Sequence, residues 1–382
     1  MVTHQQPQGR GNKMTTAIFL GAGASAAEGA PIQSALFKQY FASPNVQKES
    51  PMYRDLAQFF ESVFGINLAK PIADITFPTF EEALGILDLA EARKESLRGF
   101  SVGAPPTGVQ LPPHANRVQL LRLDLILVMA KAIDEGLRRK RKPGLNGKAG
   151  PHQVLVKNLK KLALINDTIF ISTNYDLCID EALANSQEYE RDYAVDFDES
   201  GAIPIISPQA ITVRLFKLHG SLNWLYCPVC NNVKRFGTKA ALSLAYQGRT
   251  INQCGFCDSI LSPVIVPPTF YKDMSRVFLS SIWNKAEDAL REVDHVIFCG
   301  YSLPDADMHI KYLLKRMQTN RTDPESVRFT LVNHHKTPPK KKKDADIEEQ
   351  RYLRFLGKRV KDTRSSFEKF AKDPGAFYEM GK

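Results

Sequence analysis

Short apolar segments of five or six residues alternate with helical segments along most of the chain, and this alternation constrains the fold most strongly. Strands that are apolar on both faces are typical of parallel sheets covered by helices on both sides. We therefore predict an α/β fold built on a Rossmann-like parallel sheet. The predicted strands are Thr16–Leu20, Thr168–Ser172, Val213–Leu218, Ser262–Val266, His295–Cys299 and Val327–Val332, and helices are predicted at 176–183, 282–291 and 305–317.

Two segments interrupt a predicted main domain of residues 14–335, and two others flank it. Residues from about 40 to 150 have helical periodicity in three stretches and predict a helical insertion. A second, small module is expected at about 224–262, where four cysteines lie. The polar residues 1–13 predict a flexible extension, and residues 336–382 predict a charged tail with short helices. The three helical stretches of the insertion are 51–65, 80–98 and 115–137.

Composition excludes several classes of protein. A hydrophobic content of 43% is too high for a disordered chain. No apolar run approaches the ~20 residues that span a bilayer, and residues 1–13 lack the apolar centre of a signal peptide. We therefore expect a cytoplasmic protein. The net charge of +10 is concentrated in 138–142 and 340–343, which we interpret as solvated loops because no aromatic residues alternate with the charges, although direct nucleic-acid binding stays open.

The first predicted strand ends in Gly21-x-Gly23-x-x-Ala26, which is the Gly/Ala form of the dinucleotide-binding turn. Glycine allows the backbone to approach a pyrophosphate, and Ser25 adds a hydroxyl donor. An ordinary turn between strand and helix is the alternative. No second strand ends in an acidic residue about 20 positions further on, as the common dehydrogenase pattern requires, and this omission disfavours hydride transfer.

Polar residues follow two further strands, where the carboxyl edge of a parallel sheet forms a ligand crevice. Thr173, Asn174 and Asp176 follow the strand at 168–172, and His219 follows the strand at 213–218. Histidine titrates near neutral pH and can act as a base. Asn174 can hold a water or a ribose hydroxyl, whereas Asp176 is equally suited to cap the helix after it.

Two later strands end in the same way. Gly300 and Ser302 follow the strand at 295–299, and Asn333 follows the strand at 327–332. Ser302 can cap a helix entered at Pro304, or it can contribute to a phosphate or ribose site.

Four of the six cysteines form two C-x-x-C pairs that are separated by 23 residues. In a cytoplasmic protein this spacing favours zinc over disulfides, and four thiolates complete a tetrahedral site without an open position. We predict a structural zinc site formed by Cys227, Cys230, Cys254 and Cys257. Cys178 and Cys299 lie alone in apolar surroundings.

Together these motifs, in this order over about 16–335, resemble the sirtuin family. The resemblance implies a Rossmann-like NAD-binding domain with a small zinc module. It implies that NAD phosphates lie at the glycine turn, that Asn174 and Asp176 face the nicotinamide ribose, and that His219 is the catalytic base. The residues implied for NAD binding at the glycine turn are Gly21, Ala22, Gly23 and Ser25, together with Thr173, and those for the adenosine half are Gly300, Ser302 and Asn333.

Departures from the family pattern bear on the substrate. Residues 29–34 lack the aromatic and the arginine that protein deacylases carry after the glycine turn, and Pro267 and Pro268 cannot donate the hydrogen bonds that pair a peptide strand. The Asn174-Tyr175-Asp176 form is similar to that of bacterial sirtuin-like NADases of antiphage defence. Three hypotheses follow: an NAD glycohydrolase that depletes NAD, an NAD-dependent protein deacylase, and a non-catalytic subunit that binds NAD or ADP-ribose.

The resemblance also implies partners. Free NAD hydrolysis would harm the host, so we expect a homo-oligomer that a separate activating partner controls. A HerA-type ATPase is favoured over a short Argonaute, and the insertion and the charged tail are the expected contact surfaces.

Overall fold

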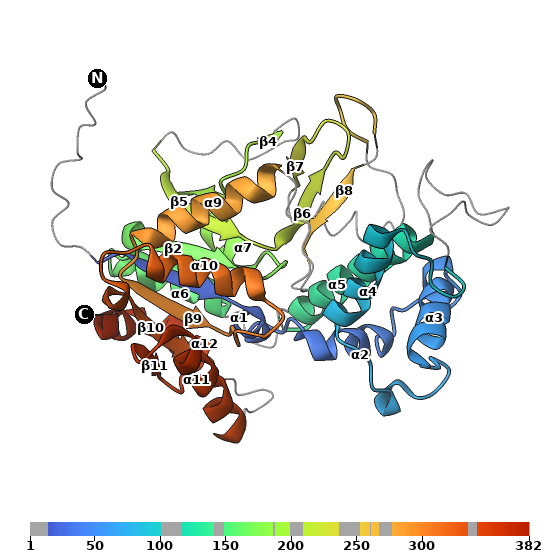
Figure 1. Cartoon of the computed structure of the whole chain (residues 1–382), viewed down its shortest axis with the longest axis horizontal. Coiled ribbons are helices and arrows are strands. Elements are labelled where there is room, and N and C mark those ends of the chain that lie inside the picture. Colours follow the sequence, from blue (N-terminus) through green and yellow to red (C-terminus); the bar gives the residue numbers. More distant parts are fainter. Residues whose placement is uncertain are drawn as a thin grey trace.

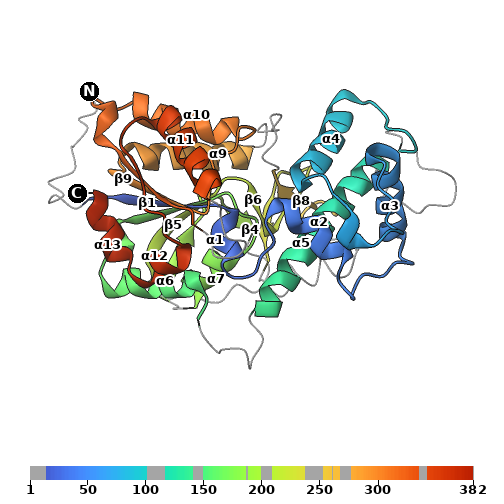
Figure 2. The ribbon, with the colours of Figure 1, turned by 90° about the horizontal axis from the view of Figure 1, so that it is seen from below.

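The computed structural model describes residues 14–100, 117–140, 149–185, 188–198, 209–236, 253–259, 261–266, 277–334 and 342–381. Within these residues the chain forms a seven-stranded sheet between two layers of helices, a helical insertion on one side, and a four-stranded sheet that lies between them (Figures 1 and 2). The expected flexible extension, residues 1–13, lies outside the described residues. Among the described helices, none combines the length and the apolar character that crossing a membrane requires.

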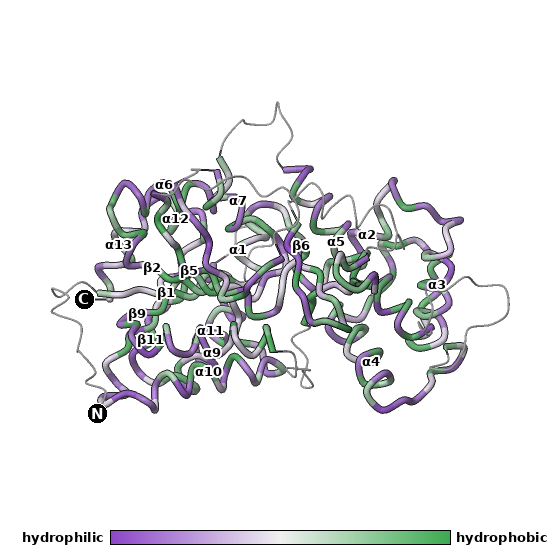
Figure 3. The backbone as a smooth tube through the Cα atoms, turned by 90° about the horizontal axis from the view of Figure 1, so that it is seen from above, coloured by the Kyte–Doolittle hydropathy of each residue, from purple (hydrophilic) through white to green (hydrophobic). Residues whose placement is uncertain are grey.

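The main sheet is parallel throughout, as the sequence predicted. Its strand order is β11-β10-β9-β1-β2-β5-β3. The central strands are buried along their whole length, and Figure 3 shows hydrophobic segments gathered in the middle of this sheet. The bounds are β1 Thr16–Leu20, β2 Thr168–Ser172, β3 Tyr189–Asp192, β5 Ile211–Lys217, β9 His295–Cys299, β10 Arg328–Val332 and β11 Val360–Asp362.

Helices cover both faces of the sheet (Figure 2). One layer contains α9 (Val277–Arg291), α10 (Met308–Thr319) and α11 (Lys342–Leu356), and the other contains α6 (Pro151–Lys161), α7 (Cys178–Ala184), α12 (Phe367–Lys372) and α13 (Pro374–Tyr378). The helices bury one face each: α9 buries Leu279, Ile282, Ala286 and Leu290, which have the three- and four-residue spacing of one helical face. Short 3₁₀ turns connect these elements at η3 Ile165–Asp167, η4 Pro324–Ser326 and η5 Glu379–Gly381.

The helical insertion has its own apolar core. Ser50 caps α3 and Pro51 occupies its first turn, while Thr79 and Glu82 form a capping box at the start of α4. Tyr175 and Ile265 of the remaining chain join this core, so the insertion contacts the loop after β2. The bounds are η1 Gln33–Ala35, α2 Leu36–Phe41, α3 Pro51–Phe64, η2 Ile72–Asp74, α4 Phe80–Arg93 and α5 Arg117–Lys140.

The four-stranded sheet corrects one expectation. The segment at 262–266 was predicted to belong to the parallel sheet, but β8 pairs antiparallel with β6 in a separate sheet of order β4-β7-β6-β8. A short apolar segment such as 262–266 fits a strand of a parallel sheet and a strand of an antiparallel pair equally well, so its sequence does not distinguish them. The bounds are β4 Phe197–Asp198, β6 Gly220–Tyr226, β7 Val233–Arg235 and β8 Ser262–Ile265.

The carboxyl-terminal segment is more closely integrated than the sequence suggested. Short helices lie at α11 and α12 near the expected positions, but β11 extends the main sheet by pairing with β10. Tyr352, Phe367 and Phe370 are fully buried in the main core. The described part of this charged tail therefore contributes an edge strand and helices on both faces of the main sheet.

The described part of the first basic cluster, residues 138–140, forms the last turn of α5 and not the expected loop, and its side chains make local contacts. Arg138 pairs with Asp134, Arg139 pairs with Glu135, and the Lys140 ammonium donates to the carbonyl of Ala27.

His295 links the stability of the main sheet to pH. Burial and, to a lesser extent, Arg328 lower the pKa of this fully buried histidine from 6.5 to about 4. The unfolded chain therefore binds the extra proton first, and stability that is complete above pH 6.5 is lost as the pH falls towards 4, by about 3 kcal/mol. Urea unfolding at pH 7.5, 6 and 5 should show this slope, and His295→Gln should flatten it. Equal slopes for the two proteins would contradict the assignment.

Candidate active site

The ends of four neighbouring strands lie at the same level of the sheet. Leu20 is in register with both Ser172 and Cys299, and Ser172 is in register with Lys217. The residues that follow β9, β1, β2 and β5 therefore meet at one edge. β2 and β5, which follow β1 in the sequence, lie on one side of β1 in the sheet, and β9 lies on its other side. The strand order therefore reverses at β1. Such a topological switch point is where open α/β sheets bind ligands.

A cavity of about 430 Å³ lies at this edge. Most of the residues that the sequence singled out line it, although they come from four separate strand ends. Gly21 and Asn333 do not line the cavity, and their binding roles stay predictions. The predicted residues along its walls are Ala22, Gly23, Ser25, Thr173, Asn174, Asp176, His219, Gly300 and Ser302.

The glycine turn after β1 lies directly against the turn after β9. The amide of Gly23 donates to the carbonyl of Gly300 at 2.9 Å, and the amide of Gly21 donates to the carbonyl of Cys299 at 2.9 Å. A Cβ at Gly21 would lie 2.6 Å from the Gly300 oxygen. Gly21 is thus required for close packing of the two backbone turns, in addition to any contact with a ligand.

Replacing Gly300 by alanine should separate these turns. Gly300 has φ +64°, and a Cβ there would lie 2.2 Å from the Ala24 nitrogen. Gly65 has a similar φ of +66° with nothing within 4 Å, so Gly65→Ala is the matched control. The left-handed backbone alone costs about 1–2 kcal/mol for alanine, and we expect Gly300→Ala to lose about 1–3 kcal/mol more through overpacking. If chemical denaturation showed equal losses of stability for Gly300→Ala and Gly65→Ala, the nearby Ala24 backbone would not restrict a side chain at position 300.

Asn174 is held with a defined orientation. Its amide nitrogen donates to the carbonyl of Gly21 and to the hydroxyl of Ser25, each at 2.9 Å, and its backbone nitrogen donates to the Ser172 hydroxyl at 3.1 Å. The side chain is buried, with 8% of the residue exposed. Because both amide hydrogens are engaged, Oδ1 is the atom that can accept a hydrogen bond from a ligand or water.

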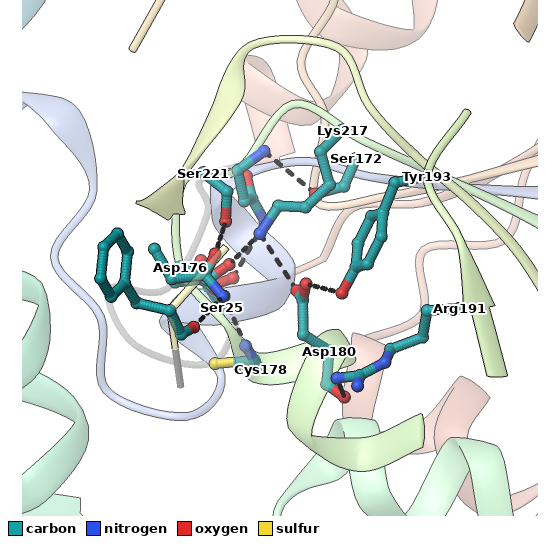
Figure 4. Close-up of polar contacts among 12 residues, drawn as sticks. Ser25, Ser172, Asp176, Cys178, Asp180, Arg191, Tyr193, Lys217 and Ser221 are labelled. Atoms are coloured by element: carbon teal, nitrogen blue, oxygen red, sulfur yellow. Dashed lines mark hydrogen bonds and ion pairs between the residues drawn. The ribbon is translucent and has the colours of Figure 1, made fainter. Parts of the chain in front are cut away.

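Asp176 lines the cavity, whereas the N-cap position of α7 is occupied by Leu177 and not by Asp176. Its Oδ1 accepts from the backbone nitrogen of Cys178 at 3.0 Å, at the start of α7. Its carbonyl accepts from the ammonium of Lys217 at 2.6 Å (Figure 4). The backbone of this loop is thereby tied to β5, two residues before His219.

Lys217 belongs to a buried polar network beside the cavity. The ammonium pairs with Asp180 at 3.0 Å, and the Tyr193 hydroxyl donates to the other oxygen of that carboxylate at 2.7 Å (Figure 4). The Arg191 guanidinium donates to the Asp180 carbonyl at 3.2 Å. Lys217 is fully buried. Burial raises the pKa of Tyr193 well above its usual range, and the neighbouring Asp180 adds to this effect.

His219 lies in the turn between β5 and β6 and is 2% exposed. Its Nε2 is 3.7 Å from Oδ1 of Asp307, a distance within ion-pair range if the ring is protonated. The Tyr301 hydroxyl donates to the other oxygen of Asp307 at 2.8 Å. Burial, followed by the charge of Asp307, raises the pKa of Tyr301 well above its usual range. The phenol therefore stays a donor and orients the carboxylate toward the histidine.

Sequence reasoning missed Asp307. This residue follows the Gly300–Asp305 motif by two positions, and the only available signal was a second acidic residue after the same strand end. The helix after β9 was expected from Asp305 with Ser302 as a cap. α10 begins at Met308 instead, with Asp307 at its N-cap position, so Ser302 does not cap it.

The insertion forms one wall of the cavity, which the sequence also did not indicate. Phe80 and Glu81 at the start of α4 line it, as do Met129 and Ile133 of α5. The Tyr175 hydroxyl donates to the carbonyl of Val266 at 3.0 Å. Helical periodicity predicts that a face is apolar, but it does not predict the surface that the face covers.

Asn333 and the outer part of the β9 loop are held from the carboxyl-terminal segment. The Asn333 amide donates to the carbonyl of Tyr301 at 2.6 Å and to the carboxylate of Glu348. Arg351 donates to the carbonyl of Ser302 at 2.9 Å. These contacts support the loop that carries Gly300 and Ser302.

The four predicted metal ligands form one cluster. Cys227 and Cys257 have their sulfur atoms 3.4 Å apart, and the Cys230 and Cys254 sulfurs are 3.5 Å apart. These distances exceed a disulfide bond and suit the edges of a tetrahedron around an ion with ~2.3 Å zinc–sulfur bonds. The turns after Cys227 and Cys254 each contain a left-handed residue, Asn231 and Asp258 respectively. The cluster is compatible with zinc and is separate from the cavity.

The chain is similar to one protein family over part of its length and to several solved structures. The family model described as SIR2-like domain matches residues 168–356, just under half of the chain. No curated protein matches the chain. A solved structure described as "The Structural basis of Sirtuin Substrate Affinity" aligns at 13% identity and a TM-score of 0.40, covering 95% of this chain and 93% of that chain. One described as "Sir2-p53 peptide-NAD+" aligns at 13% identity and a TM-score of 0.38, covering 96% and 94%.

Proposed function

We propose that this chain binds NAD in the cavity at the ends of β9, β1, β2 and β5, and hydrolyses it to nicotinamide and ADP-ribose. The observation that carries the proposal is the convergence of Asn174 and His219, from two separate strand ends, beside the glycine turn of β1. The match to the SIR2-like domain model supports a sirtuin-type function based on NAD. NAD is the substrate here, and the four-cysteine cluster holds structural zinc.

The proposed reaction breaks the bond between C1′ of the ribose and the nicotinamide nitrogen. The bonding electrons leave with the pyridine ring, and an oxocarbenium-like ribose remains. Oδ1 of Asn174 accepts a hydrogen bond from a water and directs its oxygen toward C1′. His219 takes the proton of that water, or of a ribose hydroxyl, and returns it to solvent. The products are nicotinamide, ADP-ribose and one proton.

Asp307 acts in this scheme as a positioning residue for His219. The imidazolium that forms during the reaction is stabilised by the Asp307 carboxylate, whose Oδ1 lies 3.7 Å from Nε2, and an ion pair at this distance is worth about 1–4 kcal/mol. Asp307→Asn should therefore reduce turnover about 10–100-fold with a smaller change in KM. Asp305→Asn is the matched control, because Asp305 is 69% exposed and pairs with Lys311. Equal turnover for the two variants would remove Asp307 from the mechanism.

One experiment separates the proposed reaction from deacylation and from binding alone. The purified protein is incubated with NAD, with NAD and an acetylated lysine peptide, and with its encoded neighbours, and the products are identified by mass. Release of ADP-ribose without peptide supports the proposal. Cleavage that depends on the peptide, with O-acetyl-ADP-ribose as a product, establishes a deacylase. The absence of NAD loss in every mixture leaves a binding subunit.

We also propose a role in antiphage defence, in which NAD depletion follows activation by a separate partner. A HerA-type ATPase is the favoured partner, a short Argonaute is the alternative, and the chain forms a homo-oligomer. The proposal rests on the resemblance of Asn174-Tyr175-Asp176 and on the harm that ungated hydrolysis would cause. Co-purification with the encoded ATPase, and NAD loss only in cells that hold both proteins and phage, would support it. NAD loss from the chain alone would contradict gating by a partner.

A further inference from the structure

A second group of metal-binding side chains lies outside both the cavity and the four-cysteine cluster. Glu28, His152 and Cys178 offer a carboxylate oxygen, an imidazole nitrogen and a thiol sulfur that all lie within 4.8 Å of one another. All three residues are buried, with 4%, 1% and 2% of their surfaces exposed. They come from the turn after the short helix α1 (Ala22–Ala26) and from the first turns of α6 and α7. The sequence indicated only that Cys178 lies in apolar surroundings. Glu28, His152 and Cys178 are too far apart along the chain to form a recognisable metal-ligand motif.

The cluster is already partly organised by hydrogen bonds. Oε1 of Glu28 accepts from the backbone nitrogen of His152 at 2.9 Å and lies 2.6 Å from its Nδ1. The imidazole ring rests against Phe367, with ring centroids 4.7 Å apart. The carboxylate and the imidazole are therefore fixed by the fold.

The donor set indicates which cation would fit. One thiolate, one imidazole and one carboxylate suit a borderline transition ion such as Zn²⁺, whereas Mg²⁺ and Ca²⁺ prefer oxygen ligands. Zinc bonds of about 2.0–2.3 Å place the ligand atoms of one ion about 3–4 Å apart, so small side-chain shifts would complete the site. A divalent ion would also balance a thiolate and a carboxylate that are otherwise costly to bury.

We propose that Glu28, His152 and Cys178 form a second zinc site, distinct from the four-cysteine cluster. Three protein ligands leave a fourth position for a water or another small donor. The site adjoins the candidate active site through hydrogen bonds. The backbone nitrogen of Cys178 donates to Oδ1 of Asp176, and Ser25, three residues before Glu28, accepts from Asn174. A bound ion would fix both ends of this connection and hold the loop after β2.

Metal content tests the site without reference to NAD. Protein grown and purified with zinc is analysed by inductively coupled plasma mass spectrometry, comparing the wild type with Cys178→Ala and Cys299→Ala. Cys299 is the matched control, since it is equally buried and belongs to no ligand cluster among the described residues. We expect Cys178→Ala to hold about one zinc ion per chain less than both other proteins. Equal zinc in all three would overturn the proposal.

A second variant keeps the test decisive if Cys178→Ala does not fold. Glu28→Gln preserves the size of the side chain and can still accept from the His152 backbone nitrogen. Folded Glu28→Gln, verified by circular dichroism, should also lose about one zinc ion per chain, and unchanged zinc would reject the site. Because neither measurement involves NAD, failure of this proposal is distinct from failure of the proposed reaction.

Discussion

Replacing His219 by alanine is expected to reduce NAD hydrolysis about 10²–10⁴-fold, which is the usual contribution of a positioned general base. NAD binding should persist, because the glycine turn, Ser25 and Gly300 keep their places in the cavity wall. Turnover is measured by nicotinamide release, and binding by calorimetry with the same variant. A fall in kcat without a matching change in Kd would assign His219 to the reaction step.

His334→Ala is the control for loss of a histidine elsewhere. His334 follows β10, does not line the cavity, and is half-buried. Its variant should hydrolyse NAD at the wild-type rate. If His219→Ala also retained full turnover, the assignment of the base would be wrong. If His219→Ala lost NAD binding altogether, the histidine would contribute to the binding site instead.

The position of the candidate site could be predicted from the sequence because parallel strands end at the same edge of a sheet. Once the strands before Gly21, Thr173 and Gly300 were recognised as buried and parallel, their following residues had to meet. Gly300 follows β9 and Asn174 follows β2, the strands on either side of β1, and both residues line the cavity as expected. Asn333, which follows the next strand after β9, was too far along the sheet to line the cavity.

Other features depended on contacts that no local pattern specifies. Phe80 and Met129 fit a helical core equally well whether or not that core faces a ligand. β11 has the sequence Val-Lys-Asp, and a strand of three residues at the sheet edge has little apolar signal. β3 and β6 were missed for a related reason, because polar residues in each break the apolar run by which strands were recognised.

Lys217 is the clearest case. The sequence placed it within an apolar strand, where a lysine is costly unless a partner is present. The partner, Asp180, lies on α7 and is recognisable only after β2 and β5 have been placed side by side. The Lys217 ammonium also donates to the Asp176 carbonyl, so this buried pair orders the loop after β2 beside the candidate site. We infer that this ordering offsets the free energy that burying two charges costs.

Removing that lysine should strongly destabilise the protein. Lys217→Met keeps the length of the apolar stem but leaves the Asp180 carboxylate buried without its cation. Breaking one side of a buried ion pair typically costs about 3–5 kcal/mol. Chemical denaturation should show this loss as a lower midpoint. Lys160→Met is the control, because Lys160 and Glu188 form an ion pair whose side chains are 50% and 51% exposed, and it should change the midpoint little.

The double variant Lys217→Met/Asp180→Asn distinguishes an unpaired charge from lost packing. Asparagine has the shape of aspartate and can still accept from Tyr193, but it carries no charge to leave unpaired. If the loss in Lys217→Met comes from the stranded carboxylate, the double variant should recover part of the midpoint. Its NAD turnover should stay reduced, because the Asp176 carbonyl has still lost the donor that ties it to β5. A double variant no more stable than Lys217→Met would instead assign the loss to packing around the lysine stem.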